Sequence, residues 1–240
     1  MLDIKRLLGQ IRKAVQDYNM IKDGDKIAIG VSGGKDSLAL LVALKQLQSF
    51  YPQKFELEAI TLTMGIGEFN LDPVKELCSK IGVNYTIEET LIGKIVFDVR
   101  QEKNPCSLCA NLKRGALHNT AKALGCNKLA LAHHKDDVVE TLLLSTFYEG
   151  RLHTFSPVTY LDRKDLYLIR PLIFTEEKEV KEFVKSYGLQ IVPSPCHVDG
   201  KTKREDMKKL LAEMSKENRN LKSNIFGAIK RSGIDDWKPN

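Results

Sequence analysis

The sequence GVSGGKDS, residues 30–37, lies between an apolar segment and a helical one. The segment before it, residues 26–32, is short, apolar and β-leaning, as expected of a buried strand. The segment after it, residues 36–48, has apolar residues at helical spacing. Gly33 and Gly34 let the backbone take positive φ angles and approach a ligand closely. These residues, here called the glycine loop, therefore predict an anion site at a helix N-terminus.

Polar side chains in the glycine loop strengthen this interpretation. Ser32, Lys35 and Ser37 add donors, and Asp36 or Ser37 opens the helix. The spacing matches neither G-x-x-x-x-G-K-[ST] nor G-x-G-x-x-G. A plain turn between a strand and a helix would explain two glycines alone. It does not explain why strand, glycines, donors and helix start coincide, so we interpret the loop as a phosphate site.

Strand and helix patterns alternate away from the loop. Further strands are expected at 55–64, 83–89 and 128–133, as a shorter pair within 156–170, and at 189–192; helices are expected at 71–82, 107–125, 135–150 and 175–187. This alternation predicts an α/β protein, a doubly wound parallel sheet with helices on both faces. Ligands of such sheets bind beyond the carboxyl ends of the strands, just after residues 32, 64, 89 and 133.

The two ends of the chain differ from its middle. We expect an N-terminal helix at 1–20, the α/β domain at 21–195, and a basic helical segment at 196–240. The chain is 42% apolar and 28% charged, enough to bury a core. No apolar run approaches the ~20 residues that cross a bilayer, and the N-terminus lacks the apolar block of a signal peptide. We therefore expect no membrane association and a cytoplasmic location.

The C-terminal segment carries the excess positive charge. Residues 201–231 hold ten Lys/Arg and four Asp/Glu, and their net charge equals the whole-chain value of +6. A basic segment on a neutral body suggests a polyanionic partner. A solvated lysine-rich helix is the alternative. The candidate contacts are Lys201, Lys203, Arg204, Lys208 and Lys209.

A second polar cluster follows the strand at 128–133, in AHHKDDVVETLLL, residues 132–144. His133 and His134 end the strand, and Asp136 and Asp137 fall at the next helix N-terminus. Carboxylates are favoured there and can also bind Mg²⁺. Helix capping by an Asp is the simpler explanation. Because this sheet edge is shared with the glycine loop, we favour ligand contact.

The cysteines are few, and two of them form a Cys-x-x-Cys in NPCSLCANLKRGAL, residues 104–117. A redox pair would be expected after an early strand. Structural zinc needs four ligands, and Cys196, His197 and His118 are the only further candidates. Iron–sulfur clusters take thiolates, and Cys106, Cys109 and Cys196 would supply three. The residues alone leave these interpretations open. Cys78 and Cys126 are expected to be small buried side chains.

The quoted motifs resemble those of known families. SGGKDS after the first strand resembles the pyrophosphate loop of the PP-loop ATP pyrophosphatases (adenine nucleotide alpha hydrolase-like), which split ATP between the α and β phosphates. The HHxDD segment is similar to one that lies beside ATP in lysidine synthetases and tRNA thiolases. DYNMIKDGDKIAIGVSGGKDSLALL, NPCSLCANLKRGAL, LALAHHKDDVVETLLLSTFYEGRL and LIRPL resemble the tRNA 2-thiocytidine synthetase family. This resemblance covers about residues 10–195.

The resemblance implies a [4Fe–4S] cluster, Mg²⁺ and ATP as co-substrate. It implies cluster ligation by Cys106 and Cys109, with Cys196 as third ligand. There the family reads IPCNLCG, whereas this chain reads VPSPCHVDG with one cysteine. The implied ATP contacts are Gly30, Val31, Ser32, Gly33, Gly34, Lys35, Asp36, Ser37, Leu62 and His133. The basic segment would then bind tRNA.

Related 2-thiouridine thiolases place a catalytic Lys four residues after the second cysteine and a catalytic Asp further on. Lys113 and Asp137 occupy those places, with Mg²⁺ near Asp137. The implied reaction adenylates a tRNA base at C2 and replaces its oxygen by sulfur from the open iron. A persulfide on Cys106 or Cys109 is an alternative sulfur route. The zinc-finger cysteine pairs of the thiouridine thiolases are absent, which favours cytidine.

Two other functions share some of these features. A lysidine-synthetase-like tRNA amidation needs the glycine loop and the HHxDD segment but no cluster. A zinc-containing, nucleotide-gated RNA-binding protein would transfer no sulfur. For the thiolase, the expected partners are tRNA and a sulfur donor, either sulfide or a cysteine desulfurase. The family resemblance also implies a homodimer.

Overall fold

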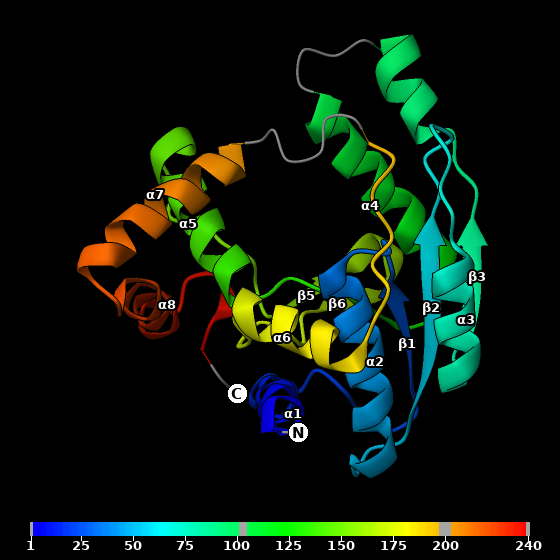
Figure 1. Cartoon of the computed structure of the whole chain (residues 1–240), viewed down its shortest axis with the longest axis horizontal. Helices are drawn as coiled ribbons and strands as arrows, with labels where there is room; N and C mark the ends of the chain where they lie inside the picture. The colour runs from blue at the N-terminus through cyan, green and yellow to red at the C-terminus, as the bar shows by residue number, and fades with distance from the viewer. Residues whose placement is uncertain (1, 101–104, 197–202, 239–240) are drawn as a thin grey trace.

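The computed structural model describes residues 2–100, 105–196 and 203–238. These residues form a six-stranded sheet with strand order β3-β2-β1-β4-β6-β5 (Figure 1). The strands are β1 (Asp25–Gly30), β2 (Phe55–Leu62), β3 (Asn84–Glu88), β4 (Lys128–Ala130), β5 (Val158–Leu161) and β6 (Leu166–Ile169). Only the edge strand β5 is antiparallel to its neighbour among the described strands. The predicted, mostly parallel sheet is confirmed.

Strand β1 marks the point where the strand order reverses. Ile29 is paired with Ala59 of β2 on one side and with Ala130 of β4 on the other. The chain then continues outward in opposite directions, to β3 on one side and to β6 on the other. A crevice at the carboxyl ends of the strands is expected at such a reversal. The glycine loop follows β1 at this place.

Helices cover both faces of the sheet. They are α1 (Leu2–Asp17), α2 (Lys35–Phe50), α3 (Asp72–Ile81), α4 (Pro105–Ala123), α5 (Lys135–Glu149), α6 (Glu177–Tyr187), α7 (Lys203–Glu217) and α8 (Leu221–Ser232). The larger core joins α1, α2 and α6 to one face. On the other face Ala121 of α4 packs with Ala28 and Ile60. The fold is therefore doubly wound, as predicted.

The strands of the sheet centre are apolar because they are covered on both faces. Ile27 and Ile29 of β1 are fully buried on one side and Ala28 on the other. A continuous apolar run of this kind is typical of a parallel strand between helices. It explains why the segment at 26–32 carries no polar alternation. Within the described residues, no helix is long and apolar enough to cross a membrane.

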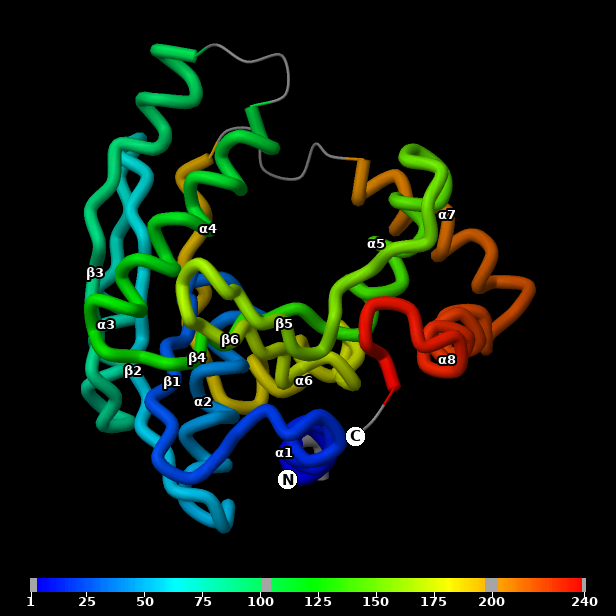
Figure 2. The backbone as a smooth tube through the Cα atoms, turned by 180° about the vertical axis from the view of Figure 1, so that it is seen from behind, coloured from blue at the N-terminus to red at the C-terminus, as the bar shows by residue number. Residues whose placement is uncertain are grey.

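The C-terminal segment is helical, as predicted, and is packed into the main core. Trp237 is fully buried, and its indole N–H donates to the Phe155 carbonyl at 2.9 Å. Its ring lies edge-on to Tyr18, which follows α1, and to Phe226 of α8. Figure 2 shows α8 on the same side of the molecule as α1. Chain ends far apart in the sequence therefore stabilise each other, while the boundary at 195 stays a prediction.

The structure differs locally from the predictions in two ways. No strand forms at 189–192; this extended segment crosses the glycine loop, and the Val192 N–H donates to the Gly33 carbonyl at 3.0 Å. Its backbone pairs with the loop instead of with a sheet edge. We call residues 189–196 the strap. A short π-helix at Lys94–Arg100 and two 3₁₀ turns, Asp162–Lys164 and Ile234–Asp236, were not predicted.

Candidate active site

The glycine loop delivers the start of α2 to the crevice. Gly33 has a φ of +80°, which favours glycine. Gly34 is the N-cap of α2 and provides no side-chain cap. The first N–H groups of a helix have no intrahelical partner, so those of α2 can bind an anion.

The loop serines hold this turn in shape. The Ser37 hydroxyl accepts from the Ser32 N–H at 3.1 Å and donates to the Gly34 carbonyl at 2.9 Å. The two hydroxyl oxygens are 3.2 Å apart. Both serines therefore order the loop through its own backbone. This is a positioning role that the sequence pattern alone did not reveal.

Lys35 and Asp36 connect the loop to α6. Lys35 Nζ lies 2.8 Å from Asp36 Oδ2 and 3.1 Å from Glu177 Oε1. Burial by itself would raise the pKa of Glu177, but Lys35, Lys208 and Lys181 outweigh it and lower that pKa to about 2. Among the described residues, Asp36 Oδ1 is buried and has no hydrogen-bond partner, and His134 Nε2 lies 3.7 Å from it. The loop thus contains one cation with two counter-ions and one carboxylate oxygen without a hydrogen bond in the described structure.

An apolar pocket of about 200 Å³ adjoins the loop. It is lined by Gly30, Val31, Ser32, Ile60, Leu62, Lys113, Arg114, Leu117 and Leu131. A Cβ at Gly30 would stand 3.0 Å from Leu117, so glycine allows α4 to come close. The pocket has the size and apolar walls that suit a planar heterocycle. Four residues predicted to contact ATP, Gly30, Val31, Ser32 and Leu62, are brought together here.

A second pocket of about 420 Å³ lies under the strap. It shares Ser32, Leu62 and Lys113 with the apolar pocket and extends to Val192 and neighbouring strap residues. Lys113 therefore stands where the two pockets meet. A cation at this position can contact ligands in both pockets.

Three thiols lie near one another, and Cys109 among them is also near Lys113. Cys106 and Cys109 lie one turn apart on α4, and Cys196 ends the strap. Burial raises the pKa of Cys109, Lys113 lowers it, and nearby Cys196 and Cys106 raise it further. The thiols are therefore close enough to act on one another. All three are free, and thiolates are the usual ligands of iron–sulfur clusters, so these residues fit a cluster. Within the described ranges, no three His, Cys, Asp or Glu side chains are already arranged around a metal position.

The HHxDD segment begins α5 with a reciprocal cap. The His134 imidazole accepts from the Asp137 N–H at 3.4 Å, and Asp137 Oδ2 accepts from the His134 N–H at 2.9 Å. Asp137 Oδ1 lies 3.0 Å from Arg204. Both oxygens of Asp137 thus have partners, and this arrangement leaves none free for Mg²⁺. In the described part of the chain, Asp36 Oδ1 beside the loop is the carboxylate oxygen that has no hydrogen bond, with His134 Nε2 3.7 Å away.

His133 and Asp136 of this segment are not among the residues that line the two pockets. Asp136 accepts from Lys222 at 2.6 Å and from the Glu177 N–H at 2.7 Å, which joins α5 to α6 and α8. The His133 ring stacks on Phe155 with centroids 4.1 Å apart. Burial, and then the charge of Arg170, lower the pKa of His133 to about 3, so its ring is neutral.

Glu140 is a buried acid that the sequence did not single out. It is fully buried, and neither carboxylate oxygen has a hydrogen-bond partner in the described structure. Arg204 lies 3.6 Å from Oε2. Burial, and then the charge of Asp137, raise the pKa of Glu140 to about 7, against the opposing charge of Arg204.

The basic residues of α7 point in two directions. Lys203 and Lys209 are exposed. Arg204 instead pairs with Asp137, and Lys208 lies 3.4 Å from Glu177. The predicted single basic face is therefore divided, and Lys201 lies outside the described residues. Arg204 and Asp137 are 67 positions apart, so no local pattern could have predicted their contact.

The fold and the site together define a class. A parallel sheet whose glycine loop opens a helix at the reversal point, beside an apolar pocket, is that of a PP-loop nucleotide-binding protein. Residues 5–214 match the family model described as the PP-loop domain.

Similar proteins narrow this class. A tRNA-cytidine(32) 2-sulfurtransferase from Pelobacter propionicus is 40% identical over 94% of this chain and 85% of its own length. One from Geobacter sulfurreducens is also 40% identical, over 94% of this chain and 89% of its own length. The chain belongs to this family of PP-loop proteins.

Solved structures agree with the fold. The U34-tRNA thiolase NcsA from Methanococcus maripaludis, solved with its [4Fe-4S] cluster, superposes with a TM-score of 0.78 at 25% identity. The match covers 95% of this chain and 78% of that one. The NH3-dependent NAD synthetase from Campylobacter jejuni has a TM-score of 0.51 at 16% identity and is similar in fold alone.

Proposed function

We propose that the protein is an ATP-dependent tRNA sulfurtransferase that replaces the C2 oxygen of a pyrimidine, with cytidine favoured, by sulfur. The observation that carries this proposal is the place of Lys113. Its side chain lines both the apolar pocket beside the glycine loop and the pocket under the strap. Burial raises the pKa of Cys109, and the charge of Lys113 opposes that rise. One cation thus lies beside both the proposed nucleotide pocket and a thiol. Activation of the base by ATP, followed by transfer of sulfur to it, requires such an arrangement.

ATP binding follows from the loop and the apolar pocket. The heterocycle would occupy the 200 Å³ pocket, between Gly30 and Leu117. The phosphates would then meet the open N–H groups at the start of α2. Lys35 would exchange a contact with Glu177 or Asp36 for a phosphate oxygen. His133 stays a proposed neighbour of the nucleotide and would contact it only as a neutral ring.

The reaction has two displacements. The C2 oxygen of the base attacks the α-phosphorus of ATP, and pyrophosphate leaves with the electron pair of the bond that breaks. A sulfur nucleophile then forms a bond to C2, and AMP leaves with the former base oxygen. Lys113 would stabilise the negative charge that develops on the transferred phosphate, as fixed cations do in such steps.

Cys106, Cys109 and Cys196 would hold a [4Fe–4S] cluster. With three thiolate ligands, one iron is left open, and this position would supply activated sulfur to the base. If no cluster is held, Cys106, the exposed thiol of the pair, would accept the outer sulfur from the persulfide of a cysteine desulfurase and so become a persulfide itself. This outer sulfur would bond to C2 as AMP leaves, and Cys109 would then attack the Cys106 sulfur, which releases the thiolated base and leaves a Cys106–Cys109 disulfide for an external thiol to reduce.

Asp137 stays a proposed catalytic residue, but it needs a change of partner. Arg204 occupies Oδ1 and the His134 N–H occupies Oδ2. We assign no step to Mg²⁺ at Asp137 for this reason. Release of Arg204 would be needed before this carboxylate could touch the substrate.

tRNA recognition would use cations outside the crevice. Lys203 and Lys209 are exposed on α7, and Lys203 lies 5.5 Å from the Tyr148 ring centroid. Arg204 and Lys208 would have to leave their carboxylates before they could bind phosphate. We further propose sulfide or a cysteine desulfurase as sulfur donor, a cytoplasmic location and a homodimer, as in the family resemblance.

Nucleotide products test this proposal. Purified protein under anaerobic conditions should convert ATP to AMP and pyrophosphate in the presence of tRNA, as chromatography can measure. ADP as the major product would contradict the assignment of the loop. Metal analysis of the same preparation separates the other functions: zinc favours the RNA-binding protein, and AMP formation without iron or sulfide favours a lysidine-synthetase-like amidation.

A further inference from the structure

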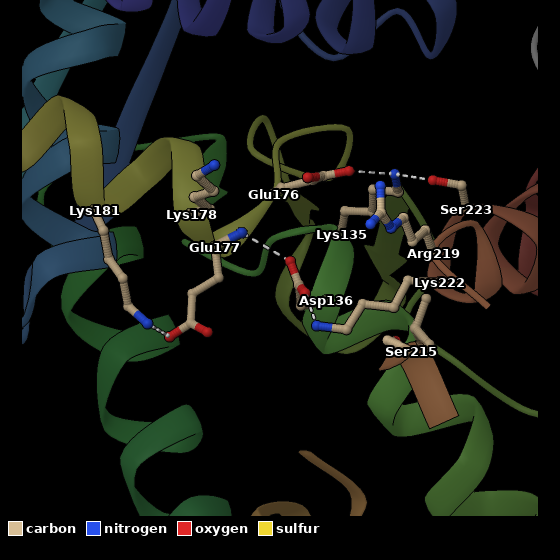
Figure 3. Close-up of a pocket in the computed structure, with 11 residues that line it drawn as sticks. Lys135, Asp136, Glu176, Glu177, Lys178, Lys181, Ser215, Arg219, Lys222 and Ser223 are labelled. Carbon is tan, nitrogen blue, oxygen red and sulfur yellow. Dashed lines mark hydrogen bonds and ion pairs between the residues drawn. The ribbon is translucent and has the colours of Figure 1, made fainter. Parts of the chain in front are cut away.

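A basic pocket of about 390 Å³ lies outside the glycine-loop crevice (Figure 3). It is formed where the N-termini of α5 and α6 meet α7 and the start of α8. We call it the α5–α6–α8 pocket. Its charged lining residues are Lys135, Asp136, Glu176, Glu177, Lys178, Lys181, Arg219 and Lys222. Five cations and three carboxylates therefore share one cavity.

Each carboxylate in this lining already has cationic partners. Asp136 accepts from Lys222 at 2.6 Å. Glu176 lies 2.8 Å from Lys135, and Glu177 lies 3.2 Å from Lys181. These pairs are drawn as dashed lines in Figure 3. The negative charge of the lining is therefore fully matched within it.

Two cations remain without a close counter-ion. In the part of the chain that the structure describes, the Arg219 guanidinium has no hydrogen bond or ion pair. Lys178 has only Glu182, at 3.8 Å, and its side chain is 81% exposed. In Figure 3, Arg219 reaches from the α8 side toward Lys135. Two like charges that face one cavity favour an anion there.

The pocket is connected to the active site through Glu177. This carboxylate lies on the pocket wall and also holds Lys35 of the glycine loop at 3.1 Å. A chain that occupies the pocket thus runs beside the crevice in which the base must react. A nucleic-acid backbone fits this layout better than an isolated ion, because Lys178 on α6 and Arg219 in the turn before α8 lie on opposite sides of the pocket (Figure 3).

We propose that the α5–α6–α8 pocket binds backbone phosphates of the substrate RNA, with Arg219 and Lys178 as the contacting cations. This inference rests on the proposed function for the identity of the polymer. It adds a second contact surface to the exposed Lys203 and Lys209 of α7, whereas Arg204 and Lys208 of that helix face carboxylates. The free cations lie where an RNA chain entering the crevice would pass.

The test compares two double variants of equal charge. Arg219→Gln/Lys178→Gln removes the two free cations of the pocket. Lys54→Gln/Lys80→Gln removes two exposed lysines that are not in this pocket: Lys54 directly precedes β2, and Lys80 lies in the last turn of α3. tRNA binding is measured by filter retention over a series of salt concentrations. Each lost phosphate contact should lower the log–log salt slope by roughly 0.7–0.9.

We expect the pocket variant to bind tRNA roughly tenfold more weakly and with a lower salt slope, as loss of two phosphate contacts implies. The control variant should keep wild-type affinity, and ATP binding should be unchanged in both. Equal weakening in the two variants would show a general charge effect and overturn the pocket. Unchanged affinity in the pocket variant would do the same.

Two further outcomes separate the pocket from the proposed function. If wild-type protein binds tRNA and the pocket variant binds it equally well, the function stands and the RNA site is wrong. If wild-type protein binds no tRNA, both are wrong. Titration with inorganic pyrophosphate supplies the last comparison: loss of pyrophosphate binding in the pocket variant, with tRNA binding intact, would make this a small-anion site and overturn the proposal.

Discussion

Lys113 shows how much a local pattern can predict about a single residue. Residues at i, i+3 and i+7 lie on one side of a helix, so Cys106, Cys109 and Lys113 share a face of α4. In the structure, Lys113 of that face lines both the apolar pocket and the pocket under the strap. A local pattern could place these three residues together because one helix carries all three side chains, while their roles stay a prediction.

Other residues of the site were beyond prediction because their partners are distant in sequence. Glu177 follows no motif, yet it holds Lys35. Arg204 was expected on an RNA-binding face but pairs with Asp137. Such contacts depend on how α6 and α7 pack over the sheet edge. Only the tertiary structure specifies that packing.

The cysteines give the first prediction at this scale. Alanine at Cys106, Cys109 or Cys196 should abolish bound iron and acid-labile sulfide in anaerobically purified protein, because each removes one of three thiolates. Cys78→Ala and Cys126→Ala should keep both, since these two thiols are buried among apolar side chains in the two cores. Iron content that survives Cys196→Ala would refute the third ligand.

Glu140 gives a prediction about pH. Its pKa rises from 4.5 to about 7 on folding, so the stability that its neutral form provides is complete below pH 4.5 and is lost as the pH rises through 7. Glu140→Gln should therefore raise the free energy of unfolding at pH 8, by on the order of 1 kcal/mol. Urea denaturation at pH 5 and pH 8 measures this difference.

The matched control is Glu76→Gln, at an exposed position of α3. It should change stability little at either pH. If Glu140→Gln destabilises the protein equally at both pH values, the carboxylate is ionised throughout and its contact with Arg204 dominates.

At the scale of elements, the strap is the informative difference. The apolar residues at 189–192 predicted a strand, but β1, β2 and β4 are already paired on both sides. The strap instead covers the glycine loop, where a Cβ at Gly33 would stand only 2.9 Å from the Cβ of Val192. The strap thereby brings Cys196 toward α4. The sequence pattern identified the apolar segment at 189–192 but could not predict that it would pack against the glycine loop.

Gly33→Ala tests this packing. A side chain at φ +80° is strained, and here it would also collide with Val192. We expect ATP affinity to fall roughly tenfold or more and stability to fall by about 1–3 kcal/mol, as strain and overpacking imply. Calorimetric titration with ATP measures the first effect and thermal unfolding the second.

Gly24→Ala is the matched control. Gly24 has the same φ of +80° but has open space around its Cβ position. It should show the strain alone, about 1 kcal/mol of stability, with normal ATP affinity. Equal ATP affinity in the two variants would mean that the strap does not shape the loop.

At the scale of the whole molecule, alternation of strands and helices predicted the sheet and the place of the crevice at the carboxyl ends of its strands. It did so because parallel strands need crossover helices. It could not predict that Trp237 would join Tyr18 and Phe226 in the main core. That contact involves the two ends of the chain and has no local periodicity. The basic C-terminal segment is therefore part of the folded body that surrounds the crevice.

The central claim is that one site activates a tRNA base with ATP and then replaces its oxygen by sulfur. Nucleoside mass spectrometry tests it directly, on tRNA incubated anaerobically with the iron-loaded protein, ATP and sulfide. We predict 2-thiocytidine with the wild-type protein, and none with a Lys113→Met variant that still binds ATP and iron. tRNA that gains no sulfur from the wild-type protein, or equal thiolation by the variant, would contradict this account.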